Sequence, residues 1–125
     1  MTLPAINATD YNLVTDLNEL EKGARYVIAA RNENYAISKT QNSNNRAAQE
    51  AKAKNGVTIS LTDTDKVAVF TLGGKTDAWT FYDENEENKG YLYAPATKGK
   101  NYLKTSNTES TYSGKNTCKI TLDGD

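Results

Sequence analysis

Apolar and polar residues alternate in short runs along most of the chain, which is the pattern of β-strands rather than helices. Val57–Leu61 alternates cleanly, and the clearest strand, Arg25–Ala30, is rich in β-forming residues. Turn-forming residues separate the runs at intervals of about 8–12 residues, as in a β-sandwich or barrel. The expected strands are Tyr11–Val14, Arg25–Ala30, Tyr35–Lys39, Val57–Leu61, Val67–Leu72, Ala78–Tyr82, Gly90–Ala94, Asn101–Thr105 and Lys119–Leu122.

The N-terminal region combines a tail with one helical turn. Residues 1–10 show no period and predict a flexible tail, so a single β-rich domain is expected over residues 11–125. One helical turn is expected at Thr15–Leu20, with Thr15 or Asp16 as its cap and its two leucines facing the core.

Three other segments predict turns and loops. Three asparagines within Thr40–Arg46 predict a polar loop. Gly73-Gly74 is expected to end the preceding strand and to form a hairpin turn. Four carboxylates within Asp83–Glu87 predict a solvated acidic turn.

The stretch Arg46–Lys54 is ambiguous on its residues alone. Its composition favours a helix, with Glu50 and Lys54 as an i,i+4 pair and Gly56 as the cap. The alternation of small and charged residues in Ala51–Lys54 favours a half-exposed strand instead. Both alternatives stay open at this point.

A weak internal repeat refines the expected fold. Phe70–Gly74 is similar to Ile120–Gly124, and Tyr35–Thr40 is more loosely similar to Tyr102–Thr105. Trefoil-type barrels are assembled from such units but need three of them, whereas the sequence holds two. We therefore expect an all-β fold of short antiparallel strands, either a Greek-key or trefoil-like barrel or a sandwich, which is incomplete at the C-terminus or closes differently.

The C-terminal residues bear on this incompleteness. Asp123-Gly124 is a common hairpin signal, so a further strand is expected to follow it. Without that strand, Lys119–Leu122 is expected at a sheet edge, with Phe70 incompletely covered. An exposed edge recruits other strands, which predicts self-association or a partner chain.

The composition argues against several classes of function. The 125 residues carry 15 basic and 16 acidic side chains in mixed order, so no basic field exists for nucleic acid. No apolar run approaches the ~18 residues of a membrane span. The chain has no histidine and a single cysteine, Cys118, which is expected to be a small buried hydrophobic residue in a strand. We expect no enzyme, no metal and no cofactor.

The remaining chemical motifs are weak. The alternate oxygen ligands of Asp83, Asn85 and Glu87 suggest an irregular calcium site, but the glycine and the twelfth position of an EF-hand are missing. Gly73-Gly74-Lys75-Thr76 lacks the first glycine of a phosphate-binding loop.

Aromatic residues provide the candidate binding site. On alternating strands, Tyr91 and Tyr93 share one face, opposite Leu92. If Leu92, Phe81 and Leu103 point inward, the tyrosines point outward together as a platform for a sugar ring or a protein. The alternative is that the tyrosines are core or sheet-covering residues. The candidate ligand-binding residues are Tyr82, Tyr91, Tyr93, Tyr102, Trp79 and Asn101.

Several short motifs follow one another along the chain, at Tyr11–Asp16, Gly23–Ala30, Tyr35–Arg46, Val67–Leu72, Gly90–Ala94 and Asn101–Thr105. Their order and spacing resemble a β-rich accessory module that recurs in extracellular proteins of Bacteroidales gut bacteria, often appended to secreted nucleases or surface proteins. The resemblance covers most of residues 11–122 and lacks the strand pair that usually follows in that family.

The resemblance implies a strand at Arg46–Lys54 and a non-catalytic accessory role outside the cytoplasm. Together with the tyrosines it predicts an extracellular or cell-surface binding or adhesion module whose ligand is a glycan or a protein. The alternative is a structural or assembly domain, such as a stalk, a virion decoration or a subunit that packs through sheet edges.

Overall fold

The structure, a computed structural model, describes residues 8–30, 33–42, 44–62, 64–94, 103–106 and 117–122. In these residues the chain is all-β, with one turn of 3-10 helix and no α-helix. The elements are β1 (Thr9–Asn12), η1 (Leu17–Glu19), β2 (Arg25–Tyr26), β3 (Ala29–Ala30), β4 (Tyr35–Asn42), β5 (Asn45–Glu50), β6 (Thr58–Leu61), β7 (Phe70–Lys75), β8 (Ala78–Asp83), β9 (Gly90–Tyr93) and β10 (Lys104–Ser106).

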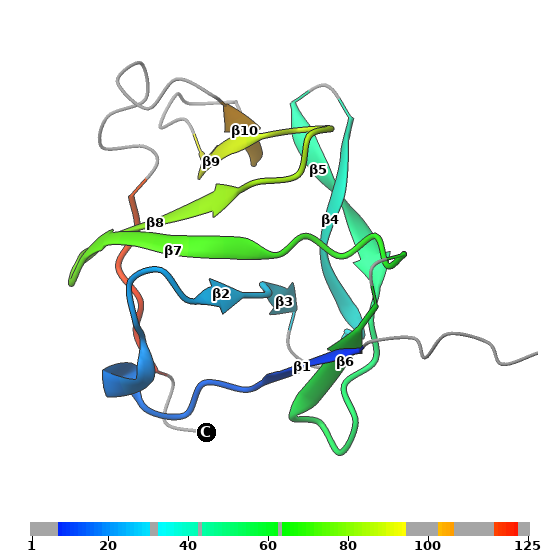
Figure 1. Cartoon of the computed structure of the whole chain (residues 1–125), viewed down its shortest axis with the longest axis horizontal. Helices are drawn as coiled ribbons and strands as arrows, with labels where there is room; N and C mark the ends of the chain where they lie inside the picture. Colours follow the sequence, from blue (N-terminus) through cyan, green and yellow to red (C-terminus); the bar gives the residue numbers. More distant parts are fainter. Residues whose placement is uncertain are drawn as a thin grey trace, which may run out of the picture.

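The described strands form three antiparallel sheets (Figure 1). A five-stranded sheet has the order β10-β9-β8-β7-β2, a three-stranded sheet has the order β3-β4-β5, and β1 pairs with β6 alone. These strands do not close into a barrel, and the arrangement is sandwich-like. The all-β class and the short antiparallel strands are therefore confirmed.

The first strands depart from the expected boundaries. Thr9 and Asp10 already pair with β6, so the expected tail ends earlier than residue 10, while residues 1–7 lie outside the described residues. The helical turn is confirmed as η1, where Asp16 Oδ1 accepts a hydrogen bond of 2.9 Å from the Asn18 N–H. Leu17 does not face the core, because it is 38% exposed.

The segment Arg25–Ala30 forms two strands in two sheets, not one strand. Its first half, β2, pairs with β7, and its second half, β3, pairs with β4. At the crossing, the Ile28 carbonyl accepts a hydrogen bond from the Ile37 N–H at 2.9 Å, and Val27 packs against the core cluster. The run of β-formers predicted extended backbone correctly, but the change of partner depends on tertiary contacts.

The β4–β5 hairpin replaces the expected Asn-rich loop. Thr40–Arg46 lies mostly in strands, with Gln41 opposite Arg46 and Asn42 opposite Asn45. The strand expected at Arg46–Lys54 is confirmed as far as Glu50, after which only Lys54 forms an isolated bridge, to Thr58. A neighbouring strand with free backbone groups thus outweighed the helical composition of this stretch.

The β7–β8 hairpin does not turn at its glycines. Strand β7 continues through Gly73 and Gly74 to Lys75, and the turn falls at the next two residues, where Asp77 has a φ of 67°. Gly74 has a φ of 82°, and a Cβ there would collide with the Ala78 carbonyl oxygen. Glycine is therefore required within the hairpin rather than at its tip.

The core contradicts the expectation of uncovered apolar residues around Phe70. Phe70 is 0% exposed and meets the Phe81 ring edge-to-face, with centroids 6.2 Å apart. The expected strand Lys119–Leu122 is not formed, and only Cys118 pairs there, through two backbone hydrogen bonds to Trp79. Leu103, expected to point inward, is 39% exposed.

Candidate functional site

The structure brings part of the tyrosine row together. Tyr82 and Tyr91 lie opposite each other on β8 and β9, and their rings meet edge-to-face with centroids 4.8 Å apart. Tyr93 follows on the same side of β9 because alternate residues of a strand share a face. Trp79 is half-buried near the other end of β8.

The row is less exposed than the sequence predicted. Tyr82 and Tyr91 are half-buried, and Tyr93 is only 5% exposed, with the Lys104 ammonium 5.9 Å from its ring centroid. The expectation that Tyr93 points into solvent is therefore wrong. Asn101 and Tyr102 lie outside the described residues. A binding role for the row stays a prediction.

The acidic turn after β8 is not uniformly solvated, because its first carboxylate is buried. Asp83 is 2% exposed, and its Oδ2 lies 2.8 Å from Nη2 of Arg46, whose side chain is 1% exposed. Asp83 Oδ1 accepts from the Asn85 N–H at 2.9 Å, and Asn85 Oδ1 accepts from the Glu87 N–H at 3.1 Å. The side-chain oxygens of Asp83 and Asn85 thus accept hydrogen bonds that hold the turn. The described residues contain no group of three His, Cys, Asp or Glu side chains that could hold a metal ion.

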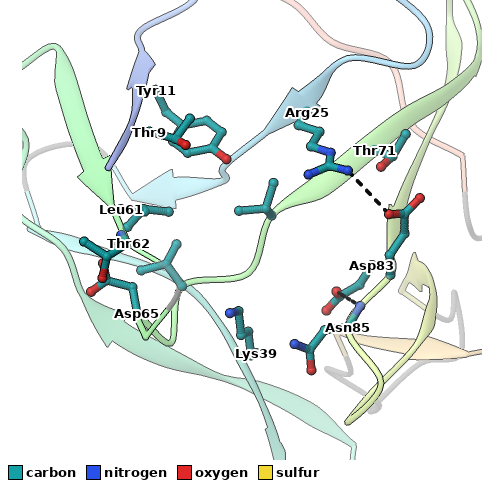
Figure 2. A pocket seen from close by; sticks show the side chains of 13 residues that line it. Thr9, Tyr11, Arg25, Lys39, Leu61, Thr62, Asp65, Thr71, Asp83 and Asn85 are labelled. Atoms are coloured by element: carbon teal, nitrogen blue, oxygen red, sulfur yellow. Dashed lines mark hydrogen bonds and ion pairs between the residues drawn. The ribbon is translucent and has the colours of Figure 1, made fainter. Parts of the chain in front are cut away.

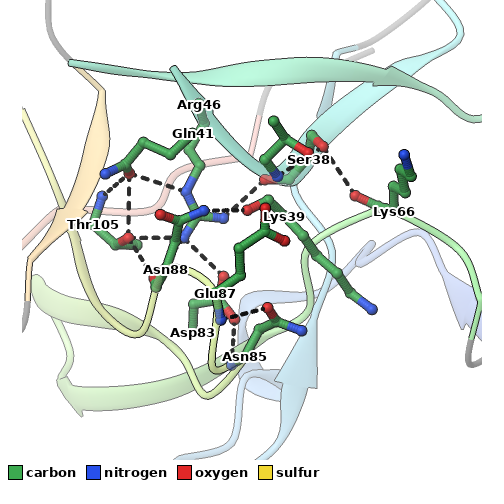
Figure 3. Close-up of polar contacts among 11 residues, drawn as sticks. Ser38, Lys39, Gln41, Arg46, Lys66, Asp83, Asn85, Glu87, Asn88 and Thr105 are labelled. Atoms are coloured by element: carbon green, nitrogen blue, oxygen red, sulfur yellow. Dashed lines mark hydrogen bonds and ion pairs between the residues drawn. The ribbon is translucent and has the colours of Figure 1, made fainter. Parts of the chain in front are cut away.

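Arg46 is the centre of a buried polar network between two sheets (Figure 3). From β5 it donates to the Ser38 carbonyl on β4 at 2.8 Å and to Gln41 Oε1 at 3.2 Å. It also donates to Thr105 Oγ1 on β10 at 2.8 Å and to the Asn88 carbonyl after β8 at 2.9 Å. The guanidinium carbon lies 5.9 Å from the Phe70 ring centroid.

One nitrogen of Arg46 faces more acceptors than it has hydrogens to donate. Nη2 of Arg46 carries two hydrogens but faces three acceptors: Asp83 Oδ2, the Asn88 carbonyl and Thr105 Oγ1. Asp83 Oδ2 accordingly has no hydrogen bond of good geometry, and only the ion pair compensates its charge. Burying two charges is costly, so their attraction and the surrounding donors must offset that cost.

A polar cavity of about 270 Å³ opens on the other side of Asp83 (Figure 2). All three sheets line it: Tyr11 comes from β1, Arg25 from β2 and Lys39 from β4. The wall also includes the hydroxyl and amide groups of Thr9, Thr62, Thr71 and Asn85 and the apolar side chains of Leu61, Val67 and Val69. The volume is just below the range of about 300–1,000 Å³ that is typical of small-molecule sites.

The charges around the polar cavity are mostly paired. Glu84 lies 3.8 Å from Arg25, and Asp65 Oδ2 accepts from both the N–H and the hydroxyl of Thr62. Arg46 compensates Asp83. Arg25 and Lys39 therefore balance Glu84 and Asp65, and the ammonium group of Lys39 has no acceptor among the described residues.

A second hollow has the opposite character. This apolar groove of about 330 Å³ is lined mainly by aliphatic and aromatic side chains from β3, β4 and β5 and by Leu103. Tyr35 on its wall is 47% exposed. Arg46 also lines this groove, so the buried ion pair stands between the two hollows.

Cys118 differs from its expected role as a buried residue. It is exposed, although the surrounding protein removes enough water from the thiol to raise its pKa above the usual value.

In the described residues, no helix is long and apolar enough to cross a bilayer.

The chain matches no protein-family model, no curated protein and no solved structure. The site therefore has to be assessed on its own geometry. Sequence reasoning missed Arg46 and the cavity residues Tyr11, Lys39 and Asp65, because no local motif marks them. They come from separate strands and loops that meet only in the folded chain.

Proposed function

We propose that the chain is a non-catalytic, extracellular binding module that holds an uncharged sugar unit of a glycan in the polar cavity. The polar cavity itself is the observation that carries this proposal. Its wall combines several hydrogen-bond donors and acceptors with balanced charge, which suits a ligand rich in hydroxyl groups and without net charge. The Tyr11 ring supplies an apolar surface for the sugar ring.

The ion pairs and hydrogen bonds of the carboxylates support a non-catalytic function. Glycoside hydrolysis needs two carboxyl groups placed on opposite sides of the substrate, one as an acid and the other as a base or nucleophile. Here Asp83 and Glu84 each face an arginine, and Asp65 caps its own loop. Groups engaged in this way are suited to holding a ligand rather than to transferring protons.

A titration followed by NMR tests this function. A panel of neutral monosaccharides (glucose, galactose, mannose and N-acetylglucosamine) is added to the isotope-labelled chain, and amide shifts are mapped. We expect one sugar to shift the amides of Tyr11, Lys39 and Asn85. Shifts confined to β8 and β9 would instead assign the site to the tyrosine row, and no shifts with any sugar would contradict the glycan proposal.

Three matched Tyr→Ala variants separate the candidate surfaces. Tyr11→Ala changes the polar cavity, Tyr91→Ala the tyrosine row and Tyr35→Ala the apolar groove. We expect only the first to weaken sugar binding. Because Tyr11 also packs against the core, Lys39→Met provides a second variant of the same cavity with less effect on packing.

The apolar groove favours a second candidate function, assembly with another chain. It combines exposed apolar side chains, Tyr35 and Leu103, with the neighbouring strand β5, which lies at the edge of its sheet. Sedimentation over a range of concentrations tests this alternative. A mass that rises with concentration and returns to that of the monomer in Tyr35→Ala would favour it over glycan binding.

A further inference from the structure

The buried ion pair between Arg46 and Asp83 has contacts that extend to the wall of the polar cavity. Arg46 Nη1 donates to the Ser38 carbonyl at 2.8 Å, directly before Lys39 in the chain. Asp83, its partner, lies on the cavity wall and accepts from the Asn85 N–H at 2.9 Å. Asn85 is thus tied to the pair by one hydrogen bond, and Lys39 is tied to it through the carbonyl of the preceding residue.

The backbone of Lys39 is held from both sides. Its N–H donates to the Lys66 carbonyl at 2.7 Å, and its carbonyl accepts from Asn88 Nδ2 at 2.8 Å. Arg46 in turn donates to the Asn88 carbonyl at 2.9 Å. The ammonium group of Lys39 therefore extends from a backbone that the network fixes, as Figure 3 shows.

We propose that Arg46 is a positioning residue for the polar cavity, which sets Lys39, Asp83 and Asn85 in place for a ligand that it does not touch. This inference rests on the proposed sugar site. A fold that needed only stability would be served as well by apolar residues at these two positions, since buried pairs are often replaceable without loss. Ligand-binding walls, in contrast, gain affinity when their polar groups are fixed before the ligand arrives.

The test compares two changes at the pair with a control elsewhere in the network. Arg46→Lys keeps a charge opposite Asp83 but loses the planar fork that reaches Ser38 and Asn88. Arg46→Met combined with Asp83→Asn removes both charges, so no buried charge is left alone if the first variant fails to fold. Thr105→Val is the matched control, because Thr105 is buried and contacts Arg46 but does not line the cavity.

Two readouts are taken on folded full-length chain, well below each variant's unfolding temperature. The first is the affinity for the monosaccharide that shifts the wild-type amides. We expect a loss of about tenfold or more in both pair variants, as for residues that orient a binding group, and no change in Thr105→Val. The second is amide hydrogen exchange, in which Lys39 and Asn85 should exchange faster in the pair variants than in the control.

The outcomes separate this inference from the proposed function. If wild-type chain binds no sugar of the panel, the glycan proposal fails, and the exchange rates alone decide whether Arg46 positions the wall. Unchanged exchange at Lys39 and Asn85 in a folded pair variant overturns the positioning role. Wild-type affinity in such a variant overturns it too, while leaving the sugar site in place.

Discussion

Two arginine–carboxylate pairs meet at the end of β8, where their carboxylates, Asp83 and Glu84, are neighbours in the sequence. Arg46 and Asp83 are 2.8 Å apart, with side chains that are 1% and 2% exposed. Arg25 and Glu84 are 3.8 Å apart, with side chains that are 66% and 59% exposed. The two pairs have nearly the same residue types, but they differ in their burial and in the added hydrogen bonds.

The comparison shows that two successive residues at a strand end can lie in opposite environments. Successive residues of a strand point to opposite faces, so the last residue of β8 faces the interior and the next one faces solvent. In the interior, an unpaired charge is costly and each partner depends on the other. At the surface, water competes for both charges, and the pair contributes little to stability.

The largest expected effect is that of Asp83→Ala. The change leaves the guanidinium of Arg46 buried without a counter-charge, and we expect a loss of about 3–5 kcal/mol in the free energy of unfolding. Urea denaturation followed by tryptophan fluorescence measures it. A loss below about 1 kcal/mol would mean that water or another acceptor reaches Arg46, and the two pairs would then not differ in kind.

An intermediate effect is expected from Thr105→Val. Thr105 Oγ1 accepts from Arg46 at 2.8 Å and donates to the Asn88 carbonyl at 2.6 Å, so the isosteric valine leaves buried groups unsatisfied. We expect a loss of about 1–3 kcal/mol, measured in the same urea experiment. If the loss equalled that of Asp83→Ala, the hydroxyl rather than the ion pair would be the main support of Arg46.

A small effect is expected from Glu84→Gln. The amide keeps the shape of the side chain and removes only an exposed charge, 3.8 Å from Arg25. The expected change in the free energy of unfolding is about 0–1 kcal/mol. A larger loss would show that Glu84 supports the cavity wall through more than its contact with Arg25.

The sequence predicted strands well where local pattern decides the outcome. The runs of β8 and β9 were placed almost to the residue, because alternation and β-forming residues agree there. Prediction failed where the pairing of a strand with a distant strand determines the structure. The split of Arg25–Ala30 between two sheets and the pairing of the Asn-rich segment with β5 depend on strands far away in the sequence.

The candidate site was predicted less well for the same reason. Tyr82 and Tyr91 were correctly placed together, since they are opposite each other on consecutive strands. The sequence predicts a solvated acidic turn because carboxylates are usually solvated. No residue near Asp83 in the sequence indicates its partner Arg46, which lies in another sheet. Buried pairs of this kind are visible only once the fold is known.

The smallest expected effect is a difference in salt dependence. Exposed charges are screened over a Debye length of about 10 Å at 0.1 M ionic strength, whereas buried pairs are screened much less. A double-mutant cycle with Arg25→Gln and Glu84→Gln, repeated at low and high sodium chloride, isolates the coupling energy of the exposed pair. We expect this coupling to approach zero in high salt. The same cycle with Arg46→Met and Asp83→Asn should give a coupling that salt does not change. A buried pair that weakens in step with the exposed one would show that solvent ions reach Asp83, and the interior position of this pair would be disproved.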